Sequence, residues 1–149
     1  MGDEVKARTP HGEMTIDQLA ELQPGMAGIM KEVGDRYTKS YCAAKGGNWK
    51  LAAYHLNMIR VAFRNAKVTR PKFTEDLSAF DSENLLPVFK AIQAEDWTGF
   101  EEAFIKGMER SDFYHDKTGH PYIRYVLPDD PPSVLFQGPP EKFKRGSKG

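Results

Sequence analysis

A hydroxyl, a phenol and an imidazole lie close together in the chain at Ser111, Tyr114 and His115. In a helix, Ser111 and His115 are one turn apart, so their side chains lie on one face and could form a hydrogen bond. An imidazole titrates near neutral pH and can act as a general base or as an anchor for a ligand. We therefore take these three residues as the candidate catalytic residues.

His115 is open to three interpretations. It could be a core histidine that is hydrogen-bonded to Ser111 or to a neighbouring helix, as most buried imidazoles are. It could instead serve a small-molecule pocket, or it could be the axial ligand of a haem held without covalent bonds. A serine nucleophile is disfavoured, because no glycine loop that could form an oxyanion hole is visible.

Basic and aromatic residues on other predicted helices suggest a ligand with a ring and an acidic group. One or two arginines, together with tyrosines, could hold a carboxylate while the ring packs against aromatic side chains. The alternative is that the arginines reach solvent or pair with nearby acids. The candidate ligand-binding residues are Arg36, Tyr37, Tyr41, Arg60, Trp97, Phe104 and Met108.

A helical periodicity positions these groups at the end of an apolar face. The stripe consists of Trp97, Phe100, Phe104, Met108, Ser111 and His115. Asp96 is suited to cap this helix, and Gly119 followed by His120-Pro121 is suited to end it. The polar end of an apolar face is where we expect the functional site.

Three further amphipathic helices are predicted, over residues 24–45, 48–68 and 82–93, with 69–81 as a connection. The two-residue Gly46-Gly47 link requires the first two to be antiparallel. The predicted fold is all-α, an antiparallel up-down four-helix bundle over residues 15–125. A short extra helix that begins with a capping box at Thr15 precedes it.

The two ends of the chain lack helical periodicity. Residues 1–14 are polar and are predicted to be a flexible arm. Residues 126–149 are Pro-rich and basic and are predicted to form an extended tail, held over the bundle by Tyr122, Ile123 and Tyr125. The string Leu135 to Pro139 (LFQGP) resembles a viral 3C protease cleavage sequence, so a vector origin of part of the tail is an open alternative.

Three segments resemble the small four-helix haem proteins related to cytochrome c′: residues 22–30 (LQPGMAGIM), 47–54 (GNWKLAAY) and 111–123 (SDFYHDKTGHPYI). The resemblance implies the same bundle and a homodimer built on the first two long helices. The family bears Cys-x-x-Cys-His on its last helix. This chain has Ser111 and Tyr114 in place of the two cysteines and keeps the histidine as His115.

The departure from the family excludes covalent haem at this position, because attachment needs two thiols and the one cysteine is Cys42. We therefore expect no cofactor, with non-covalent haem as the alternative. No metal site is predicted, because the chain lacks the paired Glu-x-x-His motifs of di-iron bundles. The single cysteine also rules out an internal disulfide.

Composition bears on partners and location. The 21 basic and 21 acidic residues cancel, so we expect neither a nucleic acid nor a membrane as partner. No stretch resembles a membrane span or a signal peptide, so the chain is expected to be cytoplasmic, or periplasmic if a leader has been removed. A second apolar patch on the 48–68 helix, formed by Tyr54, Met58 and Val61, is the expected dimer contact, with a position under the following loop as the alternative.

Three functions follow from these observations. The first is a haem-less cytochrome c′-like bundle that binds a small, partly aromatic or carboxylate-bearing molecule between its helices, with catalysis by His115 left open. The second is a haem b protein for gas binding or electron transfer, with His115 as axial ligand. The third is a structural or interaction dimer without a ligand.

Overall fold

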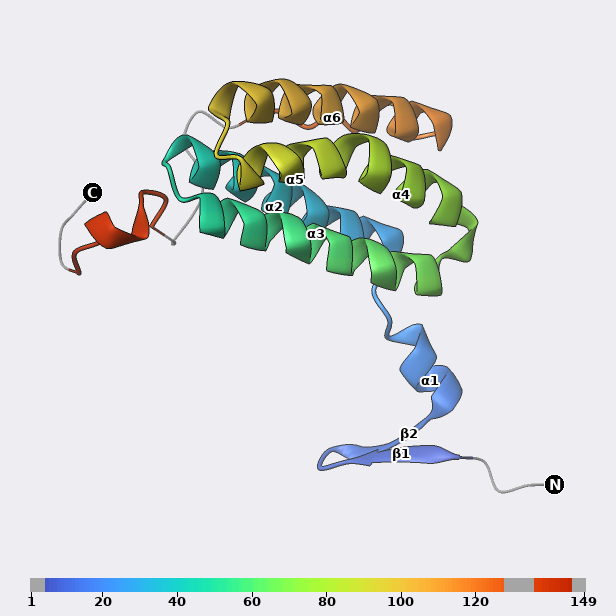
Figure 1. Ribbon diagram of the computed structural model, residues 1–149. Coiled ribbons are helices and arrows are strands. Elements are labelled where there is room, and N and C mark those ends of the chain that lie inside the picture. The colour runs from blue at the N-terminus through green and yellow to red at the C-terminus, as the bar shows by residue number, and fades with distance from the viewer. Residues whose placement is uncertain (1–4, 128–135, 146–149) are drawn as a thin grey trace.

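Four long helical segments pack antiparallel in the computed structural model, which describes residues 5–127 and 136–145 (Figure 1). The first two segments are α2 (Met26–Lys45) and α3 (Trp49–Thr69). The third joins α4 (Thr74–Phe80), the π-helical turn η2 (Asp81–Leu85) and α5 (Leu86–Gln93), and the fourth is α6 (Trp97–Lys117). The predicted all-α antiparallel four-helix bundle is confirmed.

The helix ends follow the local signals in the sequence. The Asn48 side chain accepts a hydrogen bond from the backbone N–H of Leu51, and the Asp96 side chain accepts one from that of Gly99. Each satisfies a backbone donor that the helix itself leaves unpaired. Gly47 has φ +83°, a conformation that favours glycine and lets α2 turn directly into α3.

The third helical segment is longer than the sequence suggested. The expected connection over residues 69–81 is wrong, since the short 3₁₀ turn η1 (Pro71–Phe73) leads directly into α4. Glu75 and Asp76 lie in the first turn of α4, where negative charge is favourable. In η2 the N–H of Leu86 bonds to the carbonyl of Asp81, so the helix widens by one residue immediately before Pro87, which has no N–H to donate.

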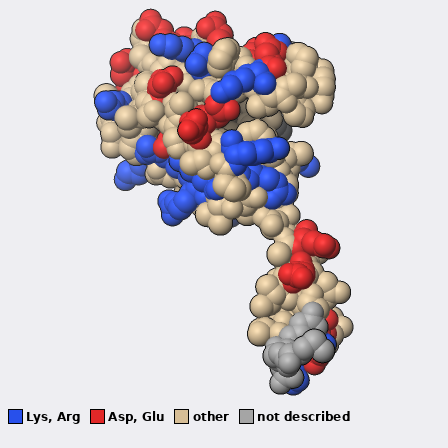
Figure 2. Space-filling model, turned by 90° about the vertical axis from the view of Figure 1, so that its right-hand side faces the viewer, with Lys and Arg blue, Asp and Glu red and all other residues tan. Residues whose placement is uncertain are grey.

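The N-terminal segment contains a β-hairpin of β1 (Lys6–Thr9) and β2 (Gly12–Thr15), which the sequence analysis did not predict; the flexibility of this arm stays a prediction. The hairpin leads into α1 (Ile16–Glu21), which begins with the predicted capping box. No residue of α1 is buried, and the hairpin and α1 extend away from the bundle (Figures 1 and 2). The bundle itself therefore begins at α2.

The chain after α6 turns back over the bundle. Residues 118–127, which we call the strap, contact α2 through Tyr125. Further on, the Asn48 side chain donates a hydrogen bond to the carbonyl of Phe136, 3.3 Å away, and the 3₁₀ turn η3 (Pro140–Lys142) follows. Residues 128–135, including Leu135 of the string that resembles a protease site, lie outside the described residues.

Charges of both signs cover the bundle on the face shown in Figure 2. Basic and acidic side chains are mixed on the upper part of the bundle in this view, whereas its lower part carries mainly basic side chains. In the described part of the chain, no helix combines the length and the apolar character that crossing a bilayer requires.

Candidate functional site

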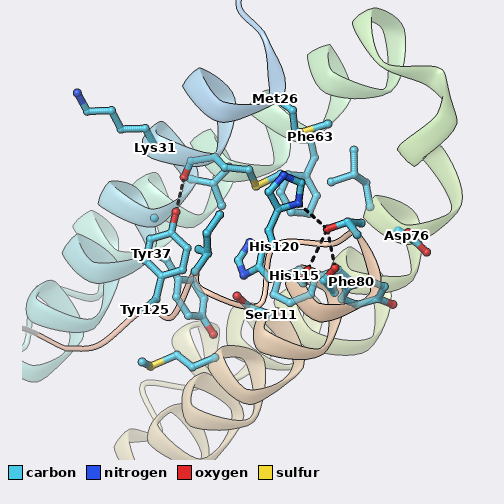
Figure 3. A pocket seen from close by; sticks show the side chains of 18 of the residues that line it. Met26, Lys31, Tyr37, Phe63, Asp76, Phe80, Ser111, His115, His120 and Tyr125 are labelled. Carbon is cyan, nitrogen blue, oxygen red and sulfur yellow. Dashed lines mark hydrogen bonds between the residues drawn. The ribbon is translucent and has the colours of Figure 1, made fainter.

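A cavity of about 490 Å³ lies between α2, α4, α6 and the strap (Figure 3). Its lining is largely apolar and aromatic, and besides tyrosines it includes the polar residues Lys31, Thr38, Asp76, Ser111, His115, Thr118 and His120. The apolar lining residues include Met26, Met30, Val33, Phe63, Phe73, Leu77, Phe80, Leu85, Phe104, Met108, Ile123 and Leu127. Among the predicted site residues, the cavity brings together His115, Ser111, Tyr114, Tyr37, Phe104 and Met108.

His115 presents an unsatisfied nitrogen. Its Nδ1 atom is buried and has no hydrogen-bond partner, and its ring lies beside that of Tyr125, with the ring centroids 5.9 Å apart. Burial lowers the pKa of His115, which favours the neutral imidazole, although the nearby Asp112 opposes this shift. His115 is therefore not a core histidine with both ring nitrogens hydrogen-bonded, because Nδ1 has no partner.

Ser111 and Tyr114 lie on the same stretch of α6. The Ser111 hydroxyl and the His115 ring occupy the same part of the cavity (Figure 3), and the described residues include no hydrogen-bond partner for this hydroxyl. The Tyr114 ring meets the edge of Phe80, with centroids 6.1 Å apart, and Arg110 lies 5.2 Å from its centre. Tyr114 thus contributes mainly a ring face to the site.

Tyr37 closes the cavity toward the middle of the bundle. Its ring stacks on that of Phe104, with centroids 4.0 Å apart, and its hydroxyl donates a 2.8 Å hydrogen bond to the Phe104 carbonyl. Burial raises the pKa of Tyr37 far above its usual range, so the phenol stays protonated. Gly107 permits this approach, because a Cβ there would collide with the Tyr37 hydroxyl.

The two predicted arginines do not reach the cavity. Arg36 bonds to Glu32, with Nε 2.7 Å from the carboxylate, and its Nη1 lies 3.2 Å from Nδ1 of His55. Arg60 pairs with Asp81 at 2.8 Å. Glu32 of α2 and Asp81 of η2 thus hold the two guanidiniums, and neither arginine lines this cavity. Carboxylate binding by these arginines stays a prediction.

Tyr41 and Trp97 lie outside the cavity as well, at the other end of the bundle. The Tyr41 hydroxyl donates to Glu101 at 3.1 Å, and the Trp97 ring packs on Phe100, with centroids 5.7 Å apart. His115 lies 18 positions after Trp97, which is about 27 Å along a helix. A cavity of this size can therefore use only the His115 end of the stripe.

The wall that η1 and α4 provide was not predicted from the sequence. Phe73, Leu77 and Phe80 line the cavity, although residues 69–81 were expected to form only a connection. Their spacing of four and three residues is typical of a helix and could have revealed this face.

The strap forms the outer wall. The Tyr125 hydroxyl donates a 3.1 Å hydrogen bond to the carbonyl of Met30, and Ile123 faces the cavity, whereas Tyr122 is 77% exposed. Gly34 allows the Tyr125 ring to lie directly on α2, because a Cβ at this position would collide with the ring. Ile123 and Tyr125 thus lie over the bundle as predicted, whereas the exposed Tyr122 does not contribute to this contact.

The lining offers His115 and His120 as nitrogen ligands for a haem iron held without thioethers. An axial histidine usually donates its second ring nitrogen to a protein acceptor, and Nδ1 of His115 has none. No arginine is present among the described lining residues to pair with propionates. Nor do three His, Cys, Asp or Glu residues of the described chain come together as metal ligands.

No family model, curated protein or solved structure matches the chain. The relationship to cytochrome c′-like proteins therefore stays a prediction from the three sequence segments, and the site is interpreted from its geometry alone.

Proposed function

We propose that this protein binds a small, predominantly apolar molecule in the cavity between α2, α4, α6 and the strap. The proposal rests on one observation: the cavity combines about 490 Å³ of space and largely apolar walls with the unpartnered Nδ1 of His115. Small-molecule sites in proteins typically enclose about 300–1,000 Å³ and use a few polar groups to orient the ligand.

The arrangement of the polar groups narrows the range of ligands that we expected from the sequence. The arginines that were expected to hold a carboxylate pair with Glu32 and Asp81 instead. The ammonium group of Lys31, which also borders the cavity, points away from it (Figure 3). A buried carboxylate would lack a cation there, and an uncharged ligand is therefore favoured.

Binding of naphthalene, a rigid apolar probe, tests this proposal. We expect the melting temperature to rise with naphthalene concentration, because a ligand at 100 times its Kd adds about 2.7 kcal/mol to the free energy of unfolding. Ser111→Trp should fill the cavity and abolish the rise. Ile105→Trp, on the exposed face of the same helix, is the matched control and should retain it.

Two results would contradict the proposal. The first is a melting temperature of the unmodified protein that does not respond to naphthalene. The second is a response that survives in Ser111→Trp, since the probe would then bind elsewhere.

Non-covalent haem is the second candidate, because two imidazoles border an apolar cavity. Titration with hemin should give a Soret band that disappears in His115→Ala if His115 is the axial ligand. Absence of the band in the unmodified protein would remove this candidate.

A further inference from the structure

Several polar groups of the cavity already have protein partners. The hydroxyls of Tyr37, Tyr125 and Thr118 donate to the carbonyls of Phe104, Met30 and Tyr114, and Asp76 is paired with Lys117. Among the described side-chain nitrogen and oxygen atoms that are buried without a partner, only Nδ1 of His115 belongs to the cavity lining. A buried polar atom without a partner costs about 1–3 kcal/mol, and a ligand could relieve this cost.

The neighbouring Ser111 supplies a complementary group. It precedes His115 by four residues, so the two side chains lie on the same face of α6, and both project into the same part of the cavity (Figure 3). A neutral imidazole nitrogen either donates or accepts a hydrogen bond, and a serine hydroxyl can do both. A ligand hydroxyl would match either tautomer, because it too can donate to one group and accept from the other.

Other ligand groups fit less well. A carbonyl oxygen could only accept, so it would match just one tautomer of His115. A carboxylate would bring a negative charge into apolar walls without a buried cation. A pure hydrocarbon would leave Nδ1 of His115 without a partner.

We propose that the natural ligand is an apolar alcohol or phenol whose single hydroxyl is hydrogen-bonded between Nδ1 of His115 and the hydroxyl of Ser111. This inference rests on the proposed function and specifies the chemical class of the ligand. His115 and Ser111 then determine specificity, while the apolar walls supply most of the affinity.

Three probes of one shape test this inference by calorimetry on the full chain: naphthalene, 1-naphthol and 1-naphthoate. At pH 7.5 we expect 1-naphthol to bind about tenfold more tightly than naphthalene, as the hydroxyl satisfies the buried nitrogen, and 1-naphthoate to bind most weakly. His115→Leu should reduce the affinity for 1-naphthol to that for naphthalene and leave naphthalene binding in place. Ser111→Ala should cause a smaller loss.

His120→Leu is the matched control, because His120 also borders the cavity but its Nδ1 lies 3.4 Å from the Thr118 hydroxyl. It should keep the preference for 1-naphthol. Should His115→Leu fail to fold, the ¹⁵N chemical shifts of the His115 ring in the unmodified protein replace it. They should move with 1-naphthol and stay unchanged with naphthalene.

Each contrary outcome has a distinct meaning. Equal affinity for naphthalene and 1-naphthol, unmoved His115 shifts, or tightest binding of 1-naphthoate would overturn the inference and leave the proposed function standing. Binding of none of the three probes would overturn the proposed function itself.

Discussion

His55 and His115 are two histidines whose pKa the fold lowers. His55 is fully buried on α3, where Nη1 of Arg36 donates to its Nδ1, so the ring proton lies on Nε2, a buried atom without a partner. Burial, and next the positive charge of Arg36, lower the pKa of His55. Burial likewise lowers the pKa of His115. When the solution is acidified, protonation of each ring is therefore less favourable in the folded chain than in the unfolded chain.

The first prediction concerns the pH dependence of stability. A histidine with a lowered pKa binds fewer protons in the folded chain than in the unfolded chain, so its contribution to the free energy of unfolding is complete above the ordinary value of about 6.5. It is lost as the pH falls through the lower, folded value. We expect the melting temperature to decrease from pH 7.5 to pH 5 and to decrease less in His115→Gln. His11→Gln, at the exposed hairpin turn, is the control.

A decrease of the melting temperature that is as steep in His115→Gln as in the unmodified protein would show that His115 does not contribute to the acid sensitivity.

The second prediction couples Gly107 to Tyr37. Replacing an exposed helical glycine by alanine normally adds up to about 1 kcal/mol of stability, but here the new Cβ would collide with the Tyr37 hydroxyl. We expect Gly107→Ala to destabilise the protein. In a Tyr37→Phe background, where the hydroxyl is gone, the loss in the free energy of unfolding should be smaller by about 1 kcal/mol or more. Urea unfolding of the four proteins of this cycle measures the coupling. Strict additivity would contradict the close approach of the Tyr37 hydroxyl to Gly107.

At the scale of elements, two segments complete the cavity by lying against α2 and α6. Neither segment was predicted from the sequence to line a site. One is α4, which continues through η2 into α5 and places Phe80 beside Tyr114. The other is the strap, which crosses α2 at Gly34 and is fixed by the hydrogen bond from Tyr125 to Met30. Among the described residues, the strap is the only part of the cavity wall that is not helical. We therefore expect a ligand to enter through the strap.

The third prediction tests this role of the strap. Gly34→Ala should displace the Tyr125 ring, because its Cβ would overlap the ring, and the strap should become accessible to trypsin after Arg124. We expect faster cleavage there and faster dissociation of naphthalene. Gly28→Ala on the same helix is the control, since its nearest neighbour would be at an ordinary 3.8 Å. Equal cleavage rates in the two variants would refute a strap seated on Gly34.

At the scale of the whole molecule, the cavity and the expected dimer surface lie on different parts of the bundle. The expected dimer surface on α3 contains Tyr54, which is 51% exposed, and the half-buried Met58 and Val61. Arg36 lies 5.5 Å from the centre of the Tyr54 ring, so the patch has a charged border on α2. The homodimer through the first two long helices stays a prediction.

The fourth prediction concerns this oligomeric state. Met58→Asp should place a charge in the contact and reduce the molar mass measured by light scattering from that of a dimer to that of a monomer. Ile105→Asp, at an exposed apolar position on α6, should leave the mass unchanged. A monomeric unmodified protein, or a dimer that persists in Met58→Asp, would contradict this assignment.

The sequence by itself determined the helices and most of their ends. Periodicity predicted α2, α3 and α6, and Asn48, Asp96 and the Thr15 capping box were assigned correctly as caps. These features follow from interactions within a few residues, between a side chain and the backbone of the next turn or between positions on one helical face. The hairpin at residues 6–15 and the helical character of residues 74–81 were not recognised, although both are also local features.

Only the tertiary structure decided which end of the α6 stripe borders a cavity and what completes it. Ser111, Tyr114 and His115 all border the cavity, and their role in catalysis stays a prediction. Their surroundings come from α2 and α4, which lie far away in the chain, and from the strap, which follows α6 directly but takes its place only through its contact with α2. Arg36 and Arg60 could not be placed from the sequence, because an arginine near the edge of an apolar stripe can turn to either side. Glu32, one turn from Arg36 on α2, and Asp81 of η2, which pairs with Arg60, determine which side each arginine takes.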